Sequence, residues 1–247
     1  MKGVWLEELT WPEAKQRFDA DAVVVIPIGA ASKAHGAHLP LKTDALTAQA
    51  LAQRLVERLP IVAAPVVGFG YYPAFTSFAG SQHLTAETFT ALLRELIASL
   101  ATQGVRRIAL LNTGVSTEQP IDAIAAETGA LALHMRTTGQ AAETLIEHKD
   151  GGHADERETS VVLALDPRSV RMAELKPQAP FAQSAATGDP TRASAFKGER
   201  LLAARIDDMV QALVHRWPDL AGPRAPGLSG AEGSRPCLLY TSDAADE

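Results

Sequence analysis

The chain has 247 residues, 46% of them hydrophobic and 21% charged, and its formal net charge is −6. This length supports one α/β domain with a large core, and the negative charge argues against a nucleic-acid partner. No apolar run approaches the ~20 residues of a membrane span, and residues 1–9 lack the apolar core of a signal peptide. We therefore expect a cytoplasmic protein without membrane contact. The single cysteine, Cys237, excludes an internal disulfide and favours a reducing compartment.

Apolar runs alternate with amphipathic segments along the chain. In order, we predict a helix at 10–18, a strand at 21–28, a helix at 44–58, a strand at 61–67, a helix at 85–102, a strand at 105–111, a helix at 119–128 and a strand at 131–135. The segment 153–164 is then expected to run from a loop into a helix, and 203–216 to form the last helix. This alternation predicts one α/β domain, a three-layer α/β/α arrangement with a mainly parallel sheet, over residues 3–217. The Pro-, Gly- and Ser-rich stretch 218–247 predicts a flexible tail. The end of that tail, 236–247, resembles translated sequencing-adapter read-through.

The segment 26–44, IPIGAASKAHGAHLPLKTD, follows the first predicted long strand. Ligands of parallel α/β sheets bind outside the carboxyl ends of the strands, which is where His35, His38 and Asp44 are expected. Imidazole and carboxylate are also ligands that zinc prefers. Two interpretations remain open: a metal site, or an aspartate that caps the next helix beside ordinary loop histidines.

Four segments in order give a more specific signal. They are the segment 26–44, the segment 72–84 (YPAFTSFAGSQHL), the segment 110–117 (LLNTGVST) and the segment 152–160 (GHADERETS). Together they resemble the motifs of the creatininase (creatinine amidohydrolase) family. In that family, two divalent metals share a bridging aspartate and polarise a water that attacks a cyclic amide carbonyl. The resemblance implies a creatininase-like fold.

The resemblance implies one metal site in this chain, with His35, Asp44 and Glu158 as ligands. We expect one divalent ion, zinc first, with manganese or iron as alternatives. The second site departs from the family pattern, because Lys33 replaces a glutamate ligand and Gly114 and Ser116 replace other ligand positions. We expect the Lys33 ammonium to lie within ~4 Å of Asp44 in place of the lost cation; the alternative is a solvated surface lysine.

His153 is the candidate general acid–base group, since histidine titrates near neutral pH. It is expected to precede the helix that contains Glu158, with Asp155 as a possible cap. Glu156 is a second proton carrier or a first-turn residue favoured by the helix dipole. Ser81 and His38 are candidate substrate contacts; their alternatives are a turn serine and a structural histidine.

The preferred function is a metal-dependent hydrolase of a non-peptide C–N bond in a small cyclic amide or formamide-like substrate. The alternative is a catalytically impaired relative that binds a small ligand or partner. A dinucleotide-binding oxidoreductase is disfavoured, because no GxGxxG follows a predicted strand. The resemblance also implies a homo-oligomer, commonly a hexamer.

Overall fold

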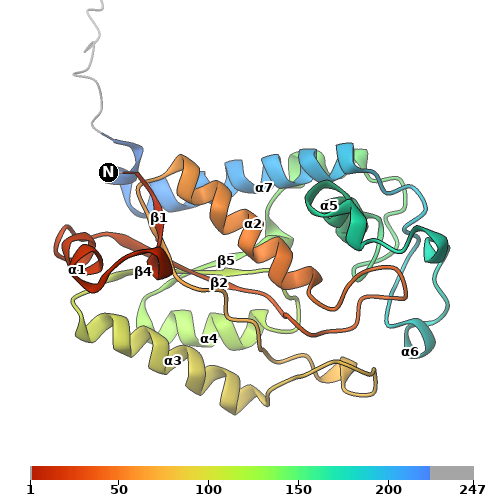
Figure 1. Ribbon diagram of the computed structural model, residues 1–247, viewed down its shortest axis with the longest axis horizontal. Helices are drawn as coiled ribbons and strands as arrows, with labels where there is room; N and C mark the ends of the chain where they lie inside the picture. Colours follow the sequence, from red (N-terminus) through yellow and green to blue (C-terminus); the bar gives the residue numbers. More distant parts are fainter. Residues whose placement is uncertain (1, 223–247) are drawn as a thin grey trace, which may run out of the picture.

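The computed structural model describes residues 2–222, which form a parallel sheet between two layers of helices (Figure 1). The strands have the spatial order β1-β3-β2-β4-β5, and every neighbouring pair is parallel. Their bounds are β1 Val4–Trp5, β2 Val23–Ile28, β3 Val62–Ala63, β4 Arg107–Asn112 and β5 Leu131–His134. The predicted three-layer α/β/α fold with a parallel sheet is confirmed.

Each face of the sheet is covered by its own group of helices (Figure 1). One layer contains α2 (Thr43–Arg58), α5 (Glu156–Leu165) and α7 (Ala195–Arg216). The other contains α1 (Trp11–Asp19), α3 (Ala86–Thr102) and α4 (Glu118–Thr128). A short helix, α6 (Phe181–Ser184), lies in the long connection between α5 and α7.

The two cores follow from the alternation of side chains along the buried strand β2. Val23 and Val25 pack into the cluster that includes α2 and α7. Val24 and Ile26 point to the opposite face and join the cluster with α3 and α4. A strand buried on both faces has no polar side, which explains the continuous apolar run in the sequence.

Apart from shifts of one or two residues, the main differences from the sequence prediction lie at three places. The strand expected at 61–67 is continuous only over Val62–Ala63, because Pro65 has no N–H to donate to a ladder, and pairing with β2 resumes as an isolated bridge at Val67. Helix α7 begins at Ala195 rather than at 203, with Ser194 capping its first turn through a bond from the Lys197 N–H. Near the expected tail, 218–221 forms a 3₁₀ turn in which Leu220 is buried. The rest of the predicted tail, 223–247, with Cys237, lies outside the described residues.

The sequence pattern does not predict the early start of α7, because Gly198 interrupts the helical pattern of apolar residues. A Cβ at this position would lie 1.9 Å from the carbonyl oxygen of Ser160 in α5. Glycine therefore lets the backbones of α5 and α7 approach closely. Both helices contribute side chains to the lining of one cavity.

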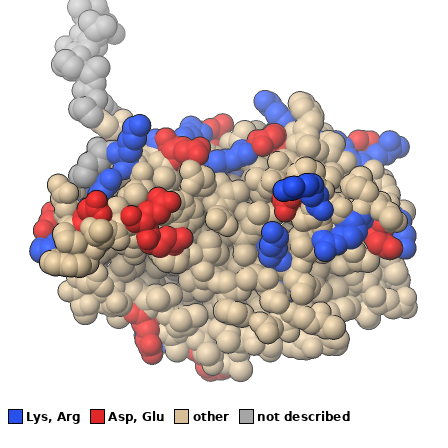
Figure 2. Space-filling model, viewed as in Figure 1, with Lys and Arg blue, Asp and Glu red and all other residues tan. Residues whose placement is uncertain are grey.

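Charged side chains are distributed unevenly on the face seen in Figure 2. They gather over α2, α5 and α7, and fewer lie over the opposite layer. Within residues 2–222, none of the helices combines the length and apolarity needed to cross a bilayer.

Candidate metal centre

Asp44 lies where the carboxyl end of β2 meets the first turn of α2. A Cβ at Gly29 would come within 2.4 Å of the Asp44 carbonyl oxygen, so only glycine permits this approach. The Thr113 hydroxyl lies within hydrogen-bond distance of that carbonyl, and the Ala45 N–H donates to Ala30 O. These contacts fix Asp44 at the edge of the sheet, where the positive end of a helix dipole favours a carboxylate.

His35 is oriented by the backbone of its own loop. Its Nδ1 lies 2.8 Å from the carbonyl oxygen of Lys33, and its Nε2 lies 3.0 Å from Asp44 Oδ1. Because a carbonyl can only accept, Nδ1 is the nitrogen that donates its proton. The other ring nitrogen, Nε2, faces the Asp44 carboxylate.

His153 is held in the same way by the next residue of that loop. Its Nε2 donates to the carbonyl oxygen of Ala34 at 2.8 Å, and its Nδ1 lies 3.6 Å from Glu158 Oε2. The rings of His153 and His35 are 4.5 Å apart between centroids. Burial, and then the neighbouring charges of His35 and Lys33, lower the pKa of His153 to about 2. The ring is therefore neutral at pH 7, with Nδ1 unprotonated.

Glu158 reaches this group from the first turns of α5. As expected, His153 precedes the helix and Asp155 caps it, accepting from the N–H groups of Arg157 and Glu158. The Glu158 carboxylate accepts from the Ala154 N–H at 2.6 Å. Burial is the main cause that raises the pKa of this carboxyl group, with the charge of Asp44 adding to it.

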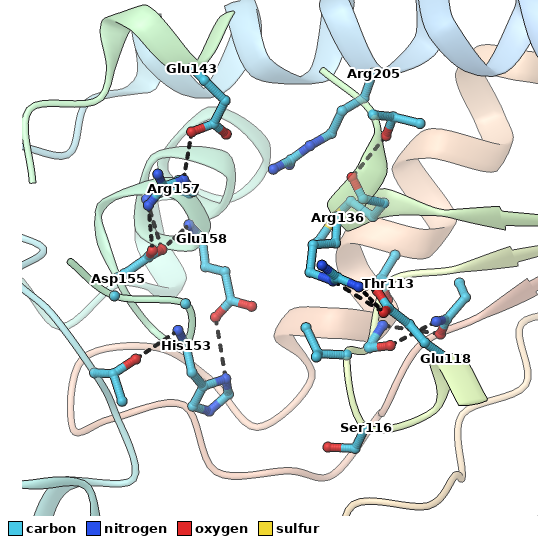
Figure 3. Close-up of a pocket in the computed structure, with 18 of the residues that line it drawn as sticks. Thr113, Ser116, Glu118, Arg136, Glu143, His153, Asp155, Arg157, Glu158 and Arg205 are labelled. Atoms are coloured by element: carbon cyan, nitrogen blue, oxygen red, sulfur yellow. Dashed lines mark hydrogen bonds and ion pairs between the residues drawn. The ribbon is translucent and has the colours of Figure 1, made fainter. Parts of the chain in front are cut away.

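Three side chains thus converge: His35, His153 and Glu158 each offer a ligand atom, and these atoms lie within 4.8 Å of one another. The sequence analysis had paired Asp44, rather than His153, with His35 and Glu158; in the structure Asp44 joins the group through His35. The dashed contact between Glu158 and His153 is visible in Figure 3, at one side of a cavity of about 590 Å³. Two imidazoles and a carboxylate form a donor set suited to a divalent ion.

Lys33 is buried against the same aspartate, as the sequence analysis predicted. Its Nζ lies 2.6 Å from Asp44 Oδ2, and the two side chains are 7% and 3% exposed. The ammonium also lies 5.0 Å from the centre of the Phe75 ring. Burial alone would raise the pKa of Asp44, but Lys33 and His35 together hold it well below its usual range. The carboxylate is therefore ionised, with the Lys33 ammonium 2.6 Å from Oδ2 and the His35 ring nitrogen Nε2 3.0 Å from Oδ1.

Comparison with known proteins agrees with the four motifs. The sequence model of one family, creatininase (creatinine amidohydrolase), matches residues 7–213. The chain belongs to the creatininase family. A relative from Mycobacterium tuberculosis, described as a mycofactocin precursor peptide peptidase, is 33% identical over 223 residues, 78% of this chain and 85% of that protein. The creatinine amidohydrolase of Pseudomonas putida is 34% identical over 117 residues, 45% of each chain.

Solved creatininase structures share the fold along nearly their whole length. A creatininase with Mn gives a TM-score of 0.75 at 25% identity, covering 88% of this chain and 100% of that one. A mutant creatininase of Zn–Zn type gives 0.74 at 26% identity, with the same coverage. The family members among these matches are amidohydrolases and peptidases, and metal binding is a property of the structural neighbours.

The segment 112–117, at the end of β4, is held by hydrogen bonds among its own residues. The Asn112 amide donates to Gly114 O at 2.7 Å, while its oxygen accepts from the Gly114 N–H and from Thr117 Oγ1. A Cβ at Gly114 would lie 2.9 Å from that Thr117 oxygen, so a histidine does not fit here without a shift. Ser116 lines the cavity at the wall opposite His153 (Figure 3).

Three other sequence candidates lie outside the converging group. The Glu156 carboxylate accepts from the N–H groups of residues 147 and 148 and from Lys197 at 2.6 Å, so it is turned away from the cavity. His38 is fully buried, and its Nε2 is bonded to Thr159 Oγ1 at 2.8 Å. Ser81 Oγ accepts from the Ala34 N–H at 3.0 Å and so anchors the loop between β2 and α2 that contains His35. These positions favour structural roles over proton transfer or substrate contact.

The sequence analysis overlooked the arginines of the cavity. Arg157 bonds Glu143 at 2.8 Å and Asp155 at 3.0 Å, and Arg205 of α7 lines the same wall. One signal was available. Arg205 lies between Leu202 and Met209 on the apolar stripe of its helix, where a charged residue is unexpected.

Proposed function

We propose that this protein is a hydrolase of a C–N bond that depends on one divalent metal ion, held by His35, His153 and Glu158. The observation behind this is the way the two imidazole rings are held. Each ring donates one N–H to a backbone carbonyl, and its other nitrogen faces Glu158 or Asp44. Metal-binding histidines are oriented in this manner in well-studied sites. Zinc fits this donor set best, with manganese and iron as alternatives.

A divalent ion held by these residues would lower the pKa of a bound water toward ~7 and would supply hydroxide at neutral pH. Asp44, kept ionised by Lys33, has an acceptor oxygen 3.0 Å from His35 Nε2, beside this group, and would orient a water there. In the reaction, the water oxygen bonds to the carbonyl carbon, the C–N bond breaks, and a proton passes to the leaving nitrogen. The products are a carboxylic acid and an amine.

Only one ring nitrogen of His153 is available, and it can serve either as a metal ligand or in proton transfer. Nε2 is bonded to Ala34 O, so only Nδ1 is available either to bind the metal or to transfer a proton. Our preferred assignment is the metal, because Nδ1 is grouped with His35 and Glu158. The sequence analysis favoured proton transfer, and the two assignments differ in how metal affinity responds to His153→Ala.

The proposed substrate is a small cyclic amide or formamide-like compound, with a peptide amide as the second choice. Two relatives support a C–N bond in general: one is described as a creatinine amidohydrolase and one as a peptide peptidase. A cavity of about 590 Å³ accepts either class, since it lies within the usual range for small-molecule pockets.

A second candidate function is a ligand-binding relative without catalysis. It is favoured by the ammonium of Lys33 beside Asp44 and by Gly114 and Ser116, which supply no imidazole or carboxylate. If one ion is insufficient for hydrolysis, the same cavity would bind an amide without cleaving it.

Elemental analysis combined with a hydrolysis panel tests the proposal. We expect about one divalent ion per chain, and cleavage of at least one cyclic amide, formamide or peptide that stops with chelation. Glu158→Gln should lose both metal and activity. Glu156→Gln is the matched control, two residues along the same helix, and should retain the metal. Metal-free protein that hydrolyses an amide equally well contradicts the proposal, and a bound metal without hydrolysis favours the binding function.

A further inference from the structure

Arg205 is a buried arginine that has no ion-pair partner among residues 2–222. It is 5% exposed, its Nε is buried without a hydrogen-bond partner, and its side chain packs over Gly139. Among residues 2–222, no carboxylate forms an ion pair with its guanidinium. Figure 3 shows the side chain extending from α7 into the cavity, between the Arg157–Asp155 contacts and the Arg136–Glu118 pair.

Such an arrangement costs stability. Guanidinium stays protonated at any physiological pH, and a buried charge without a partner is strongly unfavourable. Burial lowers the pKa of Arg205, and the nearby carboxylates of Glu143, Glu158 and Asp155 offset this only partly.

The carboxylates near Arg205 do not compensate its charge, because they are bonded to other groups. Arg157 is bonded to Glu143 and Asp155, and Arg136 Nε lies 2.9 Å from Glu118. Glu158 is turned toward His153 and the Ala154 N–H. Within the part of the chain that the structure describes, Arg205 is therefore the guanidinium lining this cavity that is left to pair with a group entering from solvent.

We propose that Arg205 binds a carboxylate of the substrate, so that the protein acts on amides that carry a free carboxylate, such as N-acyl amino acids or peptides with a free carboxyl terminus. This inference rests on the proposed function and specifies its substrate. The planar fork of a guanidinium matches a carboxylate with two parallel hydrogen bonds, which a lysine cannot reproduce. The cavity that contains Arg205 also contains His153 and Glu158, so one molecule can reach both.

Ligand binding measured on EDTA-treated protein tests this without the metal. The probes are N-acetylglycine and its neutral counterpart N-acetylglycinamide, together with tetraalanine in free and C-terminally amidated forms. We expect the free carboxylates to bind and to raise the unfolding temperature, and the amides to do neither. Stronger binding of N-acetylglycine than of free tetraalanine identifies a small amide as the source of the carboxylate, and the reverse order identifies a peptide.

Three variants accompany the probes. Arg205→Met keeps the length of the side chain and should weaken carboxylate binding about ten- to hundredfold, as expected for hydrogen bonds to a charged group. Without ligand it should unfold at a higher temperature than the native protein, because it removes a buried unpaired charge. Arg205→Lys should recover only part of the affinity. Arg54→Met is the control, since Arg54 pairs with Glu199 away from the cavity, and it should bind carboxylates normally.

The two proposals fail in different ways. If amides are hydrolysed but Arg205→Met binds N-acetylglycine and tetraalanine as tightly as the native protein, the assignment of Arg205 is wrong and the hydrolase proposal stands. If carboxylate binding depends on Arg205 but no amide is cleaved by the metal-loaded protein, the hydrolase proposal is wrong and Arg205 is still a carboxylate-binding residue. On a cleaved carboxylate substrate, Arg205→Met should raise KM and change kcat little.

Discussion

Replacing Lys33 by methionine would leave Asp44 as a buried carboxylate with one cation fewer. The two side chains are 7% and 3% exposed and lie 2.6 Å apart, so water cannot replace the lost ammonium. Removing one partner of a buried pair costs about 3–5 kcal/mol in comparable proteins. Lys33→Met should lower the free energy of unfolding by an amount in this range at pH 7.

The loss should depend on pH in a defined direction. In the native protein the pKa of Asp44 lies below its usual value of about 3.9, so its stabilisation is fully present above that pH and is lost as the pH falls through the folded pKa. Without Lys33, burial raises the pKa of Asp44 relative to the native protein, so the carboxyl group takes up a proton at a higher pH. The difference in stability between variant and native protein should therefore be largest at neutral pH and should shrink toward pH 4.

Urea unfolding at several pH values, in the presence of EDTA, measures this difference. Lys42→Met is the matched control, because Lys42 and Asp166 are 3.8 Å apart and 56% and 29% exposed, and such pairs contribute about 0–1 kcal/mol. Adding Asp44→Asn to Lys33→Met should recover part of the loss. Equal effects of the two lysine variants, with no dependence on pH, would refute the reasoning.

The remaining predictions concern the metal, the helices and the assembly. Lys33→Glu should bind a second divalent ion weakly, which calorimetric titration with zinc and manganese would detect as a raised stoichiometry. His153→Ala should lower metal affinity at least tenfold; an unchanged affinity with lost activity would make His153 the proton carrier instead. Gly198→Ala normally stabilises a helix by about 1 kcal/mol, yet here it should destabilise the protein, because the added Cβ would lie 1.9 Å from Ser160 O; thermal unfolding decides the sign. Light scattering should find a homo-oligomer, with a hexamer as the expected size, and a monomer at all concentrations would contradict it.

Local chemistry explains which parts of the fold could be predicted from the sequence. The strand Val23–Ile28 and the helix Ala86–Thr102 are strongly periodic or continuously apolar, and both were found within two residues. The start of α7 was predicted too late because glycine is a poor helix former. Gly198 is placed in this helix by its close contact with Ser160, a residue distant in sequence. The strand Val4–Trp5 was missed since two residues show no period.

The site could be predicted only where a motif fixed the residue type. The contact between Lys33 and Asp44 followed from one substitution within a known pattern, and the structure confirms that contact. The grouping of His153 with His35 could not be foreseen, because it depends on how the loop before α5 packs against the loop after β2. The hydrogen bond from the Ala34 N–H to Ser81 could not be foreseen either, since a serine after glycine fits any turn.

The loop after β2 orients both histidine rings through main-chain atoms, the carbonyl groups of residues 33 and 34. Every amino acid has a carbonyl group, so this orientation places no demand on the side chains at these two positions. The side chain at 33 can therefore change from an anion to a cation while its carbonyl continues to hold His35 in place. A protein built this way can alter the charge balance of its centre by one substitution and keep the geometry of the neighbouring ligand. The main-chain carbonyl groups thus keep the two rings in place whatever the charge of the side chain at position 33.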